Sequence, residues 1–143
     1  MSESTPVELV TDFLRSFERF DFDAMPSMMT DDVRLLLPTA PEGVEREIVG
    51  REAFTAFLHQ VKSVWTSLTL VECDVHAMVD DPTRVVAEYS SRGLNVDGST
   101  YSNTYVTIVD VRAGKIAVFQ EFFDPVPLGN AMQILAARMN SVE

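Results

Sequence analysis

The sequence predicts an α+β domain in which helices come first and a curved, mainly antiparallel sheet follows. Apolar residues recur at helical spacing over the first 65 residues and alternate at strand spacing over most of the rest. Hydrophobic residues make up 46% of the 143-residue chain, which is typical of a protein with a packed core. The expected connections are short, and no repeat interrupts them. We therefore expect one domain over residues 1–143, with helices on one face of the sheet.

Three segments in the first half have helical patterns. Pro6–Phe20 begins after Thr5, and Glu8 stands where a capping box needs it. Ala24–Met29 follows a turn and is short. Arg51–Val64 presents apolar residues on one face, namely Phe54, Phe57, Leu58 and Val61. These patterns predict three N-terminal helices.

Strand patterns dominate the remainder of the chain. Val33–Leu37 is a short apolar run closed by Pro38, and residues 38–49 are expected to form a loop. Tight turns, including Asp97–Gly98, separate four longer strands, which are Ser67–Val79, Arg84–Leu94, Tyr101–Val111 and Lys115–Phe123. Leu128–Met139 is expected to be a short C-terminal helix.

Charge and composition argue against several classes of partner. The chain has 11 basic and 22 acidic residues, a net charge of −11, which repels nucleic acids and anionic membranes. No apolar run approaches the roughly 18 residues needed to cross a bilayer. The N-terminus lacks a signal-peptide pattern, and the single cysteine, Cys73, has no internal partner. We therefore expect a cytoplasmic protein that binds neither nucleic acid nor membrane.

Six segments, taken in order, resemble the SnoaL-like and ketosteroid-isomerase-like family, which has the NTF2-like (cystatin-like) fold. They are Phe20–Met25, Thr30–Val33, Gly50–Glu52, Asp97–Val106, Ala113–Ile116 and Gln120–Pro125. The resemblance implies a cone of three helices and a curled sheet around an apolar pocket for a small metabolite. It also implies a homodimer formed through the outer face of the sheet. It does not fix a reaction, since this fold hosts many activities.

The steroid-isomerase mechanism needs a carboxylate base, a tyrosine and a protonated aspartate. The position that the resemblance assigns to the base reads Leu35–Pro38 and holds no carboxylate. The first helix offers Phe13 and Phe17 where the tyrosine stands in that family, and the aspartate position falls on Val106 or Thr107. We therefore do not expect steroid isomerisation by that mechanism.

Cyclase-like members of the family use carboxylates of the closing strand, which makes Glu121 and Asp124 the candidate catalytic residues. If Phe119, Glu121 and Phe123 share the concave face, the carboxyl group points into an apolar pocket. Desolvation then raises its pKa and suits it to acid–base chemistry. Alternatively, Glu121 is salt-bridged or exposed at the pocket mouth. Asp124 precedes Pro125, and its alternative role is to form a turn or cap the last helix.

Histidine chemistry has weaker support. His59 is a third catalytic candidate, because some family members use a histidine on the corresponding helix. On a helical wheel it falls near the polar side of that helix, which favours a solvent-facing position. His76 is far from it in sequence, and no metal-ligand spacing joins the two. We expect neither a metal site nor a cofactor.

Candidate ligand-binding residues lie on the strands and helices that would surround the pocket. Asn103 and Tyr105 share a strand face and can hydrogen-bond a carbonyl or hydroxyl group of a ligand; alternatively, they pack across strands. The expected pocket wall or core consists of Phe17, Met28, Phe54, Trp65, Tyr89 and Phe119.

Two functions remain open. The first is cofactor-independent acid–base chemistry, of isomerase, cyclase or dehydratase type, on a small, apolar, oxygenated metabolite. In it Glu121 transfers the proton, Asp124 assists, and Asn103 and Tyr105 orient the substrate. The second is a non-catalytic module of the same fold that binds a ligand or another protein.

Overall fold

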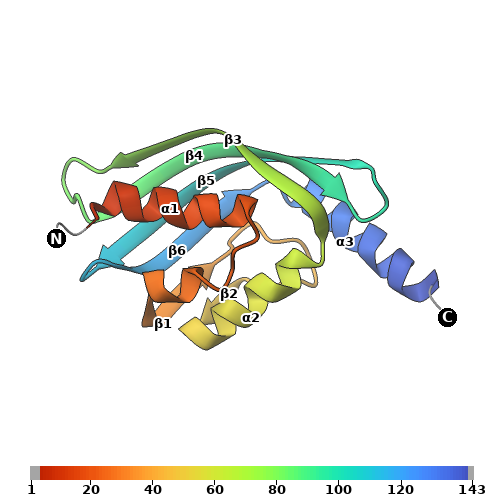
Figure 1. Ribbon diagram of the computed structural model, residues 1–143, viewed down its shortest axis with the longest axis horizontal. Helices are drawn as coiled ribbons and strands as arrows, with labels where there is room; N and C mark the ends of the chain where they lie inside the picture. The colour runs from red at the N-terminus through yellow and green to blue at the C-terminus, as the bar shows by residue number, and fades with distance from the viewer. Residues whose placement is uncertain (1–3, 142–143) are drawn as a thin grey trace.

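Four helical segments and six strands make up the structure, a computed structural model that describes residues 4–141 (Figure 1). The helical segments are α1 (Pro6–Glu18), the 3-10 helix η1 (Met25–Met28), α2 (Arg51–Lys62) and α3 (Pro125–Ser141). Residues 1–3 and 142–143 lie outside this description, so the expectations for the extreme N-terminus and for a domain over 1–143 reach beyond the described residues. The predicted α+β class is confirmed.

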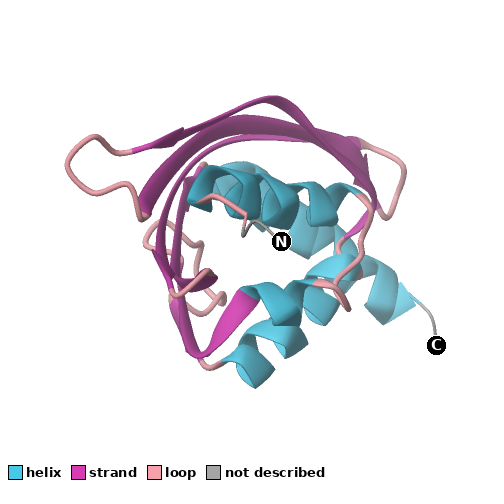
Figure 2. Cartoon of the chain, turned by 60° about the vertical axis from the view of Figure 1, so that its left-hand side comes forward, coloured by secondary structure: helices cyan, strands magenta, loops and turns pink. Residues whose placement is uncertain are grey.

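The strands form one curved, six-stranded sheet. They are β1 (Met29–Leu36), β2 (Glu47–Val49), β3 (Trp65–Ala77), β4 (Arg84–Asn95), β5 (Thr100–Arg112) and β6 (Lys115–Phe123). Their order is β2-β1-β6-β5-β4-β3, and every pairing is antiparallel except β1 with β6. Figure 2 shows the sheet curling around the helices, so its concave face and the helices enclose the interior.

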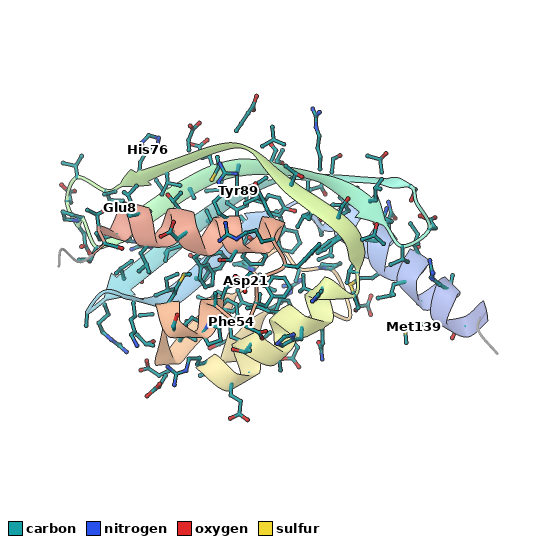
Figure 3. All side chains as sticks on the ribbon, viewed as in Figure 1. Glu8, Asp21, Phe54, His76, Tyr89 and Met139 are labelled. Carbon is teal, nitrogen blue, oxygen red and sulfur yellow. The ribbon has the colours of Figure 1, made fainter. Side chains whose placement is uncertain are left out.

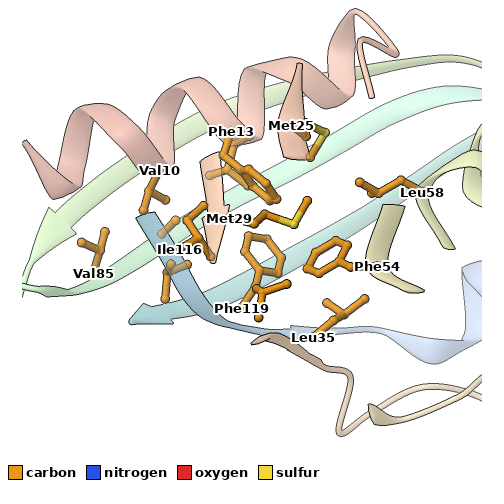
Figure 4. Packing of buried hydrophobic residues seen from close by; sticks show 14 of the residues in the cluster. Val10, Phe13, Met25, Met29, Leu35, Phe54, Leu58, Val85, Ile116 and Phe119 are labelled. Atoms are coloured by element: carbon orange, nitrogen blue, oxygen red, sulfur yellow. The ribbon is translucent and has the colours of Figure 1, made fainter. Parts of the chain in front are cut away.

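Helix α1 packs its buried face against the sheet. Thr5 caps α1 through the predicted capping box, and the buried face of the helix begins one turn later. Three rings from α1, α2 and β6 meet at the centre: the centroid of Phe13 lies 6.1 Å from that of Phe54 and 5.2 Å from that of Phe119 (Figure 4). All three side chains are buried, so the region around these rings is a packed hydrophobic core.

The predicted helix arrangement differs from the observed one in two places. The segment predicted as helix Ala24–Met29 is the four-residue 3-10 helix η1. It ends at Met28 because the backbone is extended from Met29, where β1 begins. In the described residues the third α-helix is therefore α3, which follows the sheet, and two α-helices, α1 and α2, precede the long strands. The residues assigned to a loop at 38–49 include β2, which pairs with β1.

The sheet bends sharply along β3. The register of β3 against β4 shifts between Trp65 and Ser67 and again between Val71 and Asp74. Such bulges kink a strand and increase its twist. Gly93 of β4 sits against the first kink, where a Cβ atom would lie 2.1 Å from the carbonyl oxygen of Ser67. Trp65, at the start of β3, belongs to the same buried apolar cluster as Ala131 of α3.

Candidate functional site

A cavity of about 410 Å³ lies between α2, α3 and the concave face of the sheet. Its walls are predominantly apolar, and they include Phe54 and Phe57 from α2, Phe119 from β6 and Met132 from α3. Figure 3 shows Phe54 in the interior, whereas Met139 stands near the end of α3 that extends away from the sheet. Of the described residues that line the cavity, Glu121 alone carries a carboxylate or cationic side chain.

Glu121 reaches the cavity because of strand alternation on β6. Phe119, Glu121 and Phe123 share one face of the strand, and all three line the cavity. Across the sheet, Glu121 is paired with Thr107 of β5, which is fully buried. The carboxyl group is thus enclosed by apolar side chains and strand backbone.

One hydroxyl group, that of Tyr89, holds the carboxyl group and is itself in contact with a second hydroxyl, that of Thr107. The phenol of Tyr89 on β4 donates a hydrogen bond to Oε2 of Glu121 at 2.6 Å, and Tyr89 Oη lies 2.7 Å from Oγ1 of Thr107. Burial raises the pKa of Glu121 to about 7, and the hydrogen bond from Tyr89 opposes part of that increase. Burial, with the nearby carboxylate, also holds the pKa of Tyr89 well above its ordinary value. The phenol therefore stays protonated as a donor near neutral pH.

A second polar cluster lies farther along the same strands. Tyr105 stacks on Tyr89 with ring centroids 4.8 Å apart, and its hydroxyl lies 2.7 Å from Oγ of Ser91. Burial raises the pKa of Tyr105 well above its usual range. Tyr101, which burial also keeps neutral, lines the cavity next to Tyr105. Three tyrosine hydroxyl groups thus accompany the single carboxyl group in the cavity wall.

Asn103 shares the inward face of β5, but its amide group bonds within the protein. Its Oδ1 accepts hydrogen bonds from the backbone nitrogens of Thr104, at 2.8 Å, and Asp124, at 3.1 Å. Its Nδ2 donates to the backbone oxygen of Asp124, at 2.9 Å, and to the hydroxyl of Tyr101, at 3.0 Å. The side chain fastens the end of β6 to β5 and orients Tyr101.

The predicted site residues divide into two groups. Glu121, Tyr105 and the predicted wall residues all line the cavity, with the exception of Met28, which packs against the main core. Asp124 is exposed, and its carboxylate caps α3 by accepting from the backbone nitrogen of Val126 at 3.0 Å. His59 is exposed on α2, 3.9 Å from a carboxylate oxygen of Asp23. The structure therefore does not bring Asp124 or His59 to Glu121.

Several lining residues were not singled out from the sequence. Tyr101 follows the same alternation as Asn103 and Tyr105, and that parity was the available signal. Helix α3 contributes five residues to the wall: Leu128, Met132, Leu135, Ala136 and Met139. Their role depends on the direction in which α3 leaves the sheet, which no local pattern encodes.

The part of the chain that the structure describes contains no group of three or more His, Cys, Asp or Glu side chains arranged to hold a metal ion. Within that same part, no helix combines the length and apolarity required to cross a membrane. The chemistry visible in the cavity is that of one carboxyl group and its hydroxyl partners.

Comparison with known proteins agrees with this architecture. The model of the SnoaL-like domain matches residues 10–119, well over half of the chain. The chain belongs to the SnoaL-like domain family. No curated protein gives a significant match to this chain.

Solved structures share the SnoaL-like fold over most of their length. A candidate isomerase from Bacillus subtilis matches with a TM-score of 0.79 at 20% identity, covering 91% of this chain and 96% of the other. A candidate polyketide cyclase from Xanthomonas campestris pv. campestris matches with a TM-score of 0.74 at 27% identity and the same coverage. TerC, crystallised with polyporic acid, matches with a TM-score of 0.76 at 21% identity, covering 91% and 99%.

Proposed function

We propose that this SnoaL-like protein catalyses cofactor-independent proton transfer on a small, apolar, oxygenated metabolite, with Glu121 as the acid–base group. The observation that carries the proposal is the position of this carboxyl group: it alone among the described lining residues is ionisable near neutral pH, and it faces an apolar cavity. A carboxylate in such a site accepts a proton from a carbon acid and returns it to another atom.

The pKa of Glu121 supports this role. A group whose pKa lies near the working pH is present in both protonation states, which makes it an effective proton carrier. Burial brings the pKa of Glu121 to about 7. Tyr89 fixes one carboxyl oxygen by its 2.6 Å hydrogen bond, which leaves the other for the substrate. The base is thus oriented before the substrate enters.

The cavity wall indicates the class of substrate. A volume of about 410 Å³ with mostly apolar walls suits a ligand of two to four rings. Tyr101 and Tyr105 also line this space, and their phenol hydroxyl groups suit carbonyl or hydroxyl oxygens of the ligand. The similar structures include a candidate isomerase and a candidate polyketide cyclase, and both descriptions are compatible with proton-transfer chemistry.

The test is hydrogen exchange on a model carbon acid. The protein is mixed with 2-tetralone in D₂O at pH 7, and exchange of the protons beside the carbonyl is followed by NMR. We expect the wild type to accelerate exchange over buffer and Glu121→Gln to reduce that acceleration at least about 100-fold. Glu52→Gln, at an exposed carboxylate on α2, is the matched control and keeps full activity. Equal rates in wild type and Glu121→Gln would remove the assignment.

The second candidate function is ligand binding without catalysis. It is favoured by the positions of Asp124 and His59, since neither supplies a second ionisable group to the cavity. In that case 2-tetralone binds to the protein, yet exchange stays at the buffer rate in both the wild type and Glu121→Gln.

We further propose that the protein forms a homodimer through the outer face of the sheet. Apolar side chains pair across strands on that face: Val86 opposite Ile108 and Val106 opposite Phe122. Val106 remains 41% exposed in the single chain. For location we propose the cytoplasm, because the single cysteine, Cys73, has no disulfide partner within the chain.

A further inference from the structure

A second polar position exists in the cavity, at the α3 end and away from the carboxyl group of Glu121. Trp65 begins β3 and Tyr101 begins the inward face of β5, and their ring centroids lie 4.7 Å apart. Both residues line the cavity, and α3 covers them through the buried Ala131 and the partly buried Leu128. This end of the cavity differs from the solid Phe13–Phe119 core, because here aromatic rings carrying polar hydrogens form the wall.

The indole nitrogen of Trp65 has no hydrogen-bond partner. Trp65 is 91% buried, being 9% exposed, and its Nε1 is closed to solvent and unpaired. A buried donor without an acceptor is rare in folded proteins and unfavourable. Asn95, which is paired with Trp65 across β3 and β4, also holds an unpaired Oδ1, so the indole does not use this acceptor. The N–H group is thus left over for a partner that the protein does not supply.

The hydroxyl hydrogen of Tyr101 is also left over. Two backbone N–H groups donate to Oδ1 of Asn103, which fixes the orientation of that amide, so its Nδ2 must donate to Tyr101 Oη. Tyr101 Oη also contacts the hydroxyl of Tyr105, which in turn bonds Ser91. These three hydroxyl groups make at most two bonds with one another, so one hydrogen has no acceptor among them. When Ser91 donates to Tyr105 and Tyr105 to Tyr101, that hydrogen is on Tyr101, which lines the cavity.

We propose that Tyr101 Oη and Trp65 Nε1 form a subsite that binds an uncharged carbonyl oxygen of a polycyclic ligand. This inference rests on the proposed function only in taking the cavity as the ligand site. It identifies the residues that bind a carbonyl oxygen of the ligand. A carbonyl oxygen accepts two hydrogen bonds, one for each unpaired donor. A carboxylate is disfavoured, because no cationic side chain lines the described cavity wall. Because Nε1 is closed to solvent, the indole or α3 shifts when the ligand enters.

The experiment uses a matched pair of probes, 9-fluorenone and fluorene, which differ in that fluorenone has a carbonyl group where fluorene has a methylene group. Fluorenone has no proton beside its carbonyl group that Glu121 could exchange. Dissociation constants are measured by equilibrium dialysis at pH 9, where Glu121 is ionised and cannot donate. The quantity compared is the preference, the ratio of the fluorene to the fluorenone dissociation constant. We expect Tyr101→Phe and Trp65→Phe each to lower this preference by about 3- to 10-fold, the range for one neutral hydrogen bond. Phe57→Leu, another lining residue, weakens both probes and leaves the preference unchanged.

A second measurement on the wild type avoids any folding defect of the variants. The chain has a single tryptophan, so its indole N–H gives one NMR resonance. Fluorenone is expected to move the resonance of that proton downfield, as a new hydrogen bond does, whereas fluorene does not.

An unmoved resonance with bound fluorenone, or a preference unchanged in both variants, overturns the subsite. A preference seen at pH 5 but lost at pH 9 also overturns it, since the carbonyl then binds protonated Glu121. Fluorenone binding as described, with 2-tetralone exchange independent of Glu121, leaves the subsite standing and removes the proposed function alone.

Discussion

The phenol oxygen of Tyr89 on β4 lies 2.6 Å from Oε2 of Glu121 on β6, so this hydrogen bond spans the intervening strand β5, whose Thr107 also contacts the phenol. This contact couples the ionisation of the carboxyl group to a donor that remains protonated. The hydrogen bond stabilises the carboxylate, while burial favours the neutral acid. The balance between these two effects sets the pH at which the carboxyl group changes state.

Replacing Tyr89 by phenylalanine removes the donor and leaves the apolar surroundings. We expect the pKa of Glu121 to rise further, because the effect that lowers it is lost. The acid limb of the pH–rate profile for 2-tetralone exchange therefore moves to higher pH by about one pH unit, as expected for one charge-assisted hydrogen bond. Thr107→Val removes the hydroxyl group that contacts Tyr89, and it shifts the acid limb less. An acid limb that moved to lower pH in Tyr89→Phe would contradict this account.

Stability is also expected to depend on the ionisation of Glu121. Its pKa is 4.5 when unperturbed and about 7 in the folded protein, so the folded state binds the proton more tightly. The corresponding stabilisation is fully present below pH 4.5 and is lost as the pH rises to about 7. The difference is at most about 3 kcal/mol in the free energy of unfolding.

Glu121→Gln provides the measurement for this pH dependence. Its amide does not titrate, so the decrease in unfolding free energy between pH 5 and pH 8 should be smaller by about 2–3 kcal/mol than in the wild type. Urea denaturation at several pH values gives this comparison, and Glu52→Gln is the control with wild-type dependence. Parallel curves for wild type and Glu121→Gln would show that the carboxyl group is not desolvated.

Much of the fold was accessible from local sequence patterns. The capping box at Thr5 and Glu8 gave the start of α1, and alternation gave the four long strands within a few residues. Short elements were not accessible in this way. β2 has three residues, too few to show an alternation, and it is held by its pairing with β1 rather than by its own propensity.

The site was accessible in part for a related reason. Parity between Phe119 and Phe123 predicted the inward direction of Glu121, because a strand alternates strictly. Parity also predicted that Asn103 points inward, but not that the backbone of Asp124 would occupy its amide group. That contact joins two strands, and the chain reaches it only through the turn into α3. Sequence periodicity gives the direction of a side chain, whereas its partners depend on tertiary structure.

The dimer proposal gives a direct prediction for the outer face of the sheet. Ile108→Asp places a charge opposite Val86, in the middle of the apolar pairs, and is expected to weaken self-association at least about 10-fold. Light scattering after gel filtration measures the mass over a range of concentrations. Val79→Asp is the matched control, since Val79 is 96% exposed beyond the end of β3. A monomeric wild type, or an Ile108→Asp variant that dimerises as the wild type does, would refute the interface.

Two glycines offer opposite predictions for the region around the cavity. At Gly93, a methyl group would lie 2.1 Å from the backbone oxygen of Ser67, so Gly93→Ala forces β3 away from β4 where Leu68 and Trp65 form the cavity wall. We expect a loss of at least about 2 kcal/mol in the free energy of unfolding and weaker fluorenone binding. At Gly129 in α3, the nearest atom to such a methyl group is 3.9 Å away, and Gly129→Ala is expected to stabilise the helix by up to about 1 kcal/mol. Urea denaturation of the two variants side by side separates a steric clash at the bend from a general effect of adding a methyl group. If Gly93→Ala unfolded at the same urea concentration as the wild type, the close approach of β3 to β4 would not be required for the bend.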